Sequence, residues 1–129
     1  MSANEELQMK RLIAVLGCTL LASPAFAITQ ISTGPVFQAG ANRVSCEVTN
    51  VSSRTITVDM TVFEGTGMAI AQGQSTLGPF QSAEVENTPN GASEFLTCVF
   101  LFPGSAKQVR ASLVLLDNNF LPLVALPAS

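Results

Sequence analysis

The sequence predicts an all-β fold, a single antiparallel β-sandwich of about seven or eight strands that follows a cleaved N-terminal signal helix. Three observations lead to this prediction. Apolar and polar residues alternate with a period of two through most of residues 28–129, turn-forming Gly, Pro and Asn residues separate these runs, and no later segment has the 3.6-residue period of a helix. Many short strands with regular turns in about 100 residues are typical of a sandwich.

The N-terminal segment has the features of an export signal. Lys10 and Arg11 precede an apolar stretch at residues 12–22, and Ala25-Phe26-Ala27 offers the small residues of a cleavage site. We therefore expect a signal peptide over residues 1–27 and one mature domain over 28–129. The mature domain is expected to be periplasmic or secreted.

Two alternatives concern the same segment. Translation could start at Met9, which would give the signal a basic beginning without Glu5 and Glu6. A lipid anchor at Cys18 is disfavoured because it would leave a hydrophobic region below the roughly seven residues that such signals need. The apolar stretch is also shorter than the roughly 20 residues of a membrane span.

Two clear strands flank a short polar segment at residues 50–53. Val44, Cys46 and Val48 alternate with polar neighbours, and residues 56–62 repeat this pattern, so each run has one apolar face. The short connection predicts a hairpin. Asn50-Val51-Ser52 also matches a glycosylation sequon, which we interpret as part of the turn.

Further strands are expected where apolar runs lie between turn signals. The turn signals include Gly78-Pro79 and Pro103-Gly104. The runs cover residues 29–37, 68–77, 80–87, 95–102, 108–117 and 120–126.

Cys46 and Cys98 are the cysteines that remain after cleavage of the signal. Both have apolar residues two positions away, so both are expected to point into the core, and a pair in an exported domain predicts one disulfide. The bridge would close a loop of roughly 50 residues and stabilise the fold by ~4 kcal/mol. A redox pair is the less favoured alternative, because exchange cysteines usually share a Cys-x-x-Cys turn.

The segment from Cys46 to Val58 resembles small exported bacterial proteins of unassigned function with an immunoglobulin-like or fibronectin-like β-sandwich. The resemblance implies that architecture and no functional residue. The chain differs from immunoglobulin domains because it has no Trp and because Leu96, rather than Tyr, stands two residues before Cys98.

The composition argues against most kinds of catalysis. The chain contains no His and no Tyr, so it lacks the commonest general base and the ligands of a blue-copper site, and we expect no cofactor. Met60 and Met68 are then expected at core or rim positions. The net charge of −3 without a basic cluster predicts no nucleic-acid partner, and no integral membrane span is expected in the mature chain.

Carboxylates remain as candidate catalytic or calcium-binding groups. Glu84 and Glu86 lie two residues apart on one predicted strand and share a face, where folding could add Glu47 or Asp59. Solvated charge on an outer face is the favoured interpretation.

An apolar surface on the run 95–102 is the candidate interaction site. Phe95, Val99 and Leu101 occupy the face opposite the cysteine, and that face needs a cover. The cover is expected to be internal, from the run 120–126 or from flanking strands. The alternative is a patch for self-association or for another envelope protein.

The predicted function is that of an exported, non-catalytic structural or binding module of the bacterial envelope, held by one disulfide. The first alternative is a subunit or accessory of a surface assembly that uses strand addition. A carboxylate-based enzyme is the third and least favoured class.

Overall fold

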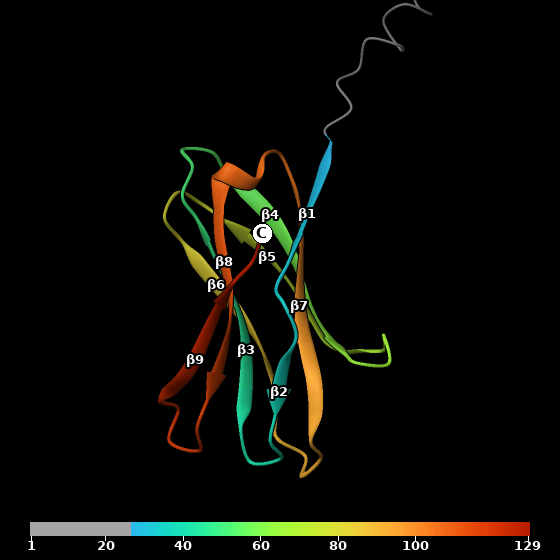
Figure 1. Cartoon of the computed structure of the whole chain (residues 1–129). Coiled ribbons are helices and arrows are strands. Elements are labelled where there is room, and N and C mark those ends of the chain that lie inside the picture. The colour runs from blue at the N-terminus through green and yellow to red at the C-terminus, as the bar shows by residue number, and fades with distance from the viewer. Residues whose placement is uncertain (1–26) are drawn as a thin grey trace, which may run out of the picture.

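The computed structural model describes residues 27–129 as two antiparallel sheets that pack face to face (Figure 1). The predicted signal segment lies almost wholly outside these residues. The sandwich prediction is confirmed, with nine strands rather than seven or eight. The strands are β1 (Ile28–Ser32), β2 (Val36–Gln38), β3 (Arg43–Asn50), β4 (Ile56–Glu64), β5 (Ala69–Leu77), β6 (Ser82–Asn87), β7 (Glu94–Pro103), β8 (Val109–Leu116) and β9 (Pro122–Pro127).

The extra strand arises near the N-terminal end of the domain. Residues 29–37 were expected as one strand, but Gly34 and Pro35 interrupt it, because Pro has no N–H to donate to the ladder. Both pieces, β1 and β2, pair with β7.

The five-stranded first sheet has the order β1-β7-β4-β5, with β2 also on β7. The four-stranded second sheet has the order β6-β3-β8-β9. One short 3-10 helix, Ala106–Gln108, connects β7 to β8. Within residues 27–129, no helix is long and apolar enough to cross a membrane.

The predicted hairpin at residues 50–53 is wrong. β3 pairs with β6 and β8, whereas β4 pairs with β5 and β7, so the connection crosses from one sheet to the other. The reason is that the apolar faces of both strands, including Val48 and Val58, meet across the core. Alternation fixes which face is buried but not which strand is the neighbour.

Asn50 organises this crossing. Its side chain is fully buried, and Nδ2 donates to the carbonyl oxygens of Arg54 (2.6 Å), Leu77 (3.0 Å) and Gly78 (3.2 Å). Its Oδ1 accepts from the N–H of Ser52 at 2.9 Å. The amide thus joins the end of β3 to the end of β5. The sequon is therefore a structural turn here, because the nitrogen that a glycan would need is buried and fully used.

The core lies between the inner faces of the sheets. Met60 is buried there, whereas Met68 is exposed in the turn between β4 and β5. The largest fully buried apolar side chains besides Met60 are Phe100, Phe102, Leu96, Leu113, Val44, Val48, Val58 and Val62.

Candidate functional site

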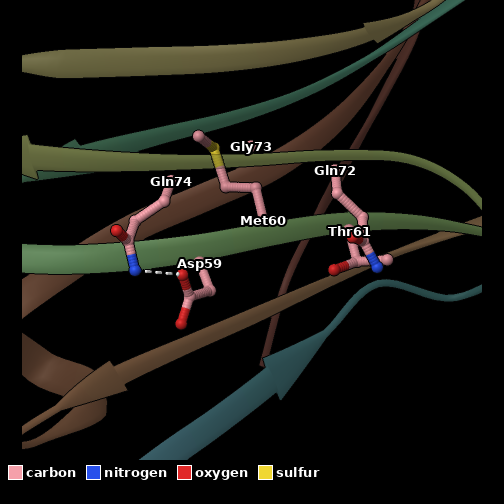
Figure 2. A pocket seen from close by; sticks show the side chains of 6 residues that line it. All are labelled: Asp59, Met60, Thr61, Gln72, Gly73 and Gln74. Atoms are coloured by element: carbon pink, nitrogen blue, oxygen red, sulfur yellow. Dashed lines mark hydrogen bonds between the residues drawn. The ribbon is translucent and has the colours of Figure 1, made fainter.

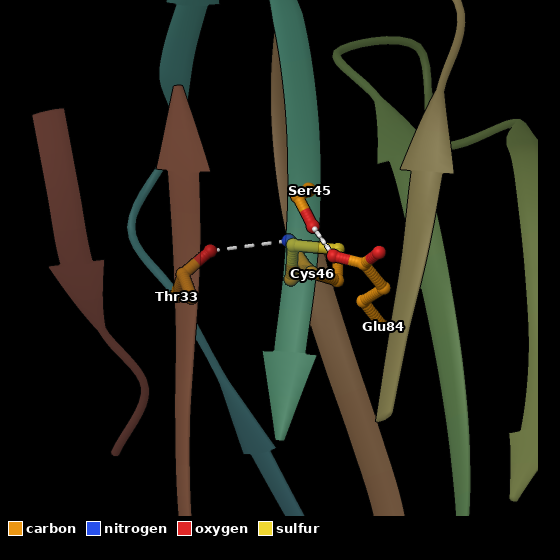
Figure 3. The surroundings of a disulfide bond; sticks show 5 residues. Thr33, Ser45, Cys46 and Glu84 are labelled. Atoms are coloured by element: carbon orange, nitrogen blue, oxygen red, sulfur yellow. Dashed lines mark hydrogen bonds between the residues drawn. A yellow bond between two sulfur atoms is a disulfide. The ribbon is translucent and has the colours of Figure 1, made fainter. Parts of the chain in front are cut away.

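The predicted disulfide is confirmed and lies at the centre of the sandwich. Cys46 on β3 and Cys98 on β7 join the facing sheets with their Cα atoms 5.7 Å apart, and both are fully buried. The backbone N–H of Cys98 donates to Oγ1 of Thr33 at 3.1 Å (Figure 3). This enclosed bridge links the two central strands of the fold.

The acidic residues divide between the two outer faces of the sandwich. Glu47 on β3 lies directly opposite Glu84 on β6, and Glu86 follows on the same face. Ser45 donates to Oε2 of Glu84 at 3.2 Å (Figure 3). Asp59 lies on β4, in the other sheet. Folding therefore brings Glu47, and not Asp59, to the predicted pair.

The contact between Glu47 and Glu84 is unfavourable for two ionised groups. Partial burial, followed by the charge of Glu84, raises the pKa of Glu47 above its ordinary value. The two side chains line a surface hollow together with Thr49 and Ser82. No group of three metal-ligating residues occurs within the described part of the chain.

The predicted patch on β7 lies on the outer face of the first sheet. Phe95 is 55% exposed, whereas Val99 and Leu101 are half-buried because β7 is flanked by β1 on one side and β4 on the other. Phe95 also packs against Phe37 of β2, with ring centroids 5.2 Å apart. The flanking strands thus supply much of the expected cover. The run 120–126 does not, because it pairs with β8 in the second sheet.

Instead of covering β7, as its sequence predicts, the run 120–126 forms an apolar surface at the edge of the second sheet. We define the β9 apolar surface as Phe120, Leu121, Leu123 and Val124, which are 56%, 60%, 53% and 43% exposed. The guanidinium of Arg43 lies 4.5 Å from the centre of the Phe120 ring. The signal in the sequence was a run that is apolar at nearly every position, so one face had to remain outside.

Two of the exposed phenylalanines adopt a backbone conformation that normally favours glycine. Among residues 27–129, Phe80 (φ 61°) and Phe120 (φ 62°) are the non-glycine residues with positive φ. Phe80, 77% exposed, follows Pro79 in the turn between β5 and β6, where Gly or Asn would be unstrained.

The backbone of the β9 edge is largely blocked. The backbone N–H of Ala128 donates to the carbonyl of Ala111, so the backbone of Ala128 points toward β8. Backbone groups of successive residues in an antiparallel strand point alternately toward and away from the neighbouring strand, so those of Ala125 and Pro127 point away from β8. The N–H of Asp117 donates to the carbonyl of Leu121, so the backbone of the next residue, Pro122, also points away from β8. Two of these three outward positions are prolines without a donor. β9 therefore presents apolar side chains but few hydrogen-bonding groups.

The β5 edge has the opposite character. The backbone N–H of Thr33 donates to the carbonyl of Cys98, so the backbone of Cys98 points toward β1 and that of Val99 points toward β4. The same alternation of backbone direction continues across β4 into β5. The backbone groups of Gln72, Gln74 and Thr76 therefore point away from β4. β5 contains neither proline nor charge.

Next to this edge, side chains of β4 and β5 line a surface pocket (Figure 2). Nε2 of Gln74 donates to Oδ1 of Asp59 at 2.7 Å. Gly73, between the two glutamines, adds no side chain to the strand. Within the described residues, β5 pairs with β4 alone, so its outer side is an open edge.

Comparisons with known proteins identify no relative of this chain: no family model, no curated protein and no solved structure matches it.

Proposed function

We propose that this chain is an exported, non-catalytic binding module of the bacterial envelope, which contacts a partner protein through the β9 apolar surface. The observation that carries this proposal is the exposure of Phe120, Leu121, Leu123 and Val124 on a disulfide-linked domain. Several exposed apolar side chains close together in sequence, at an edge strand of a small domain, favour an interface. The partner surface would itself be apolar.

The compartment is supported by the bridge between Cys46 and Cys98. Disulfides form and persist in the periplasm and outside the cell, whereas cytosolic thiols are usually kept reduced. The predicted signal peptide over residues 1–27 agrees with that location.

An immunoglobulin-like architecture is part of the proposal. Taking β3, β4 and β7 as strands B, C and F puts β4 beside β7 and β6 beside β3, as C lies beside F and E beside B in that fold. The difference is that β8 takes the place of strand A beside β3, and β1 with β2 takes the place of strand G beside β7. These neighbours support an immunoglobulin-like core whose first and last strands have exchanged places.

Strand addition is the second candidate function, and the open β5 edge favours it. An added strand requires outward-pointing backbone donors and acceptors, and the strand β5 offers them without a charged side chain. A carboxylate-based enzyme has less support, because partial burial and the neighbouring charge of Glu84 are enough to account for the raised pKa of Glu47.

Export and partner binding can be tested in one bacterial strain. Cell fractionation followed by thiol alkylation should give a periplasmic or secreted species whose Cys46 and Cys98 react only after reduction. A cytosolic species whose Cys46 and Cys98 react without reduction would overturn the proposed compartment.

For binding, a photo-crosslinking residue replaces Leu121, and the control carries it at Gln30, on the outer face of the first sheet. A discrete adduct from position 121 that is lost with Leu123→Ser supports the proposal. Equal labelling from both positions would contradict it.

A further inference from the structure

We propose that two copies of this chain pair through β5, in an antiparallel arrangement whose twofold axis passes beside Gln74. The inference concerns the partner of the second candidate function, strand addition, and is independent of the β9 apolar surface. It rests on the backbone direction, the charge and the flanking side chains of β5.

The backbone groups of β5 allow one best register. The outward positions are Gln72, Gln74 and Thr76, and an antiparallel partner must match outward positions with outward positions. When Gln74 of one copy lies opposite Gln74 of the other, Gln72 of each copy lies opposite Thr76 of its partner. All three residues then exchange hydrogen bonds with the partner, whereas a shift by two residues leaves fewer of them matched. The two first sheets would become one continuous sheet.

The charge distribution favours a second copy as the occupant. The chain has a net charge of −3, so two copies repel one another at most orientations. β5 carries no charged residue. Asp59, on the neighbouring strand β4, accepts a hydrogen bond from Gln74. In the paired arrangement the two Asp59 side chains would be about 14 Å apart, since strands are spaced by about 4.8 Å, and salt screens charges beyond about 8 Å.

Exposed apolar side chains stand at both ends of β5. Met68, 63% exposed, precedes the strand, and Phe80, 77% exposed, follows it. Both lie six positions from Gln74, so the twofold axis brings the Met68 end of one copy to the Phe80 end of the other. Sulfur and aromatic groups make favourable contacts. This arrangement gives the exposed ring of Phe80 an apolar partner.

The expected dimer is weak. One strand edge and two end contacts bury less than the roughly 1,200 Å² of a standard interface. We therefore expect dissociation constants in the micromolar range or above, on the order of 10 μM or weaker.

Sedimentation velocity over a concentration series tests the inference on the purified protein in the form that the cell accumulates. Gln74→Lys would place two like charges directly opposite each other across the axis, while Asp59 accommodates the new charge within each copy. We expect the dimer dissociation constant to rise at least about tenfold. Gln30→Lys is the matched control, with the same charge change on β1, and should leave dimerisation unchanged.

Mixing Gln74→Lys with Gln74→Glu tests the register itself. Each variant alone should be monomeric, and the mixture should form a heterodimer, because only a pairing centred on residue 74 makes the opposite charges adjacent. Monomer at all concentrations, or a dimer that resists Gln74→Lys, would overturn the inference. Loss of β5 pairing would leave crosslinking from Leu121 intact, so the two proposals fail separately.

Discussion

The edge strands β9 and β5 expose opposite kinds of surface. β9 exposes Leu123 and Val124, while Pro122 and Pro127 remove donors from its outer side. β5 exposes Gln72 and Gln74 and keeps its outward donors and acceptors. The difference shows that a sandwich edge can offer side chains without backbone pairing, or backbone pairing without apolar side chains. The four predictions that follow probe this contrast.

The disulfide should give the largest effect and act on both edges alike. Replacing Cys46 and Cys98 together with Ala removes a link between two central strands, which lie inside both edges. We expect the free energy of unfolding to fall by ~4 kcal/mol, measured by urea denaturation. The unaltered protein with reductant is the control and should lose a similar amount. Loss of amide protection at one edge alone, measured by hydrogen exchange, would contradict the view of one cooperative core.

Asn50→Ala should affect β5 and leave β9 unchanged. The substitution leaves the carbonyl oxygens of Leu77 and Gly78 without their buried donor at the end of β5. We expect a loss of about 3 kcal/mol in unfolding free energy. Hydrogen exchange should accelerate along β5 before β9. Asn87→Ala, which removes the partly buried bond to Oε1 of Gln38, serves as a control with a smaller loss.

Phe80 and Phe120 allow a comparison of two strained turns. Phe80→Gly should raise the free energy of unfolding by about 1 kcal/mol, because glycine adopts positive φ without steric cost. Phe120→Gly should gain less, since it also loses the contact with Arg43, worth about 0.5 to 1 kcal/mol. Thermal denaturation measures both. Destabilisation by Phe80→Gly would show that the ring contributes to the fold itself.

Glu47, on the outer face of the second sheet, should give the smallest effect. Its raised pKa means that the folded state binds more protons than the unfolded state, so this group lowers stability as pH rises from about 4.5 through the folded pKa. Glu47→Gln should remove that decline and stabilise the protein at pH 7 by about 0.5 kcal/mol. Glu86→Gln, which lacks an opposing carboxylate in its strand pair, is the control. Equal effects of both variants would argue against the specific Glu47–Glu84 contact.

Alternation and cysteine placement predicted most of the fold. The period of two located the strands and put Cys46 and Cys98 inside, because side-chain direction is a local property of a strand. Strand neighbours depend on contacts between distant segments, and for that reason the hairpin at residues 50–53 was wrong. The β9 apolar surface was missed for the same reason: its sequence is apolar, but whether it covers β7 or remains exposed depends on which sheet it joins.

The most direct measurement is amide hydrogen exchange at both edges as the protein concentration is raised. The account predicts that exchange at Gln72, Gln74 and Thr76 slows with concentration, because these donors become paired between copies. Ala125, the outward donor between the prolines of β9, should exchange at a constant rate. Concentration-independent exchange on β5, or slowing at Ala125 instead, would contradict the distinction between the two edges.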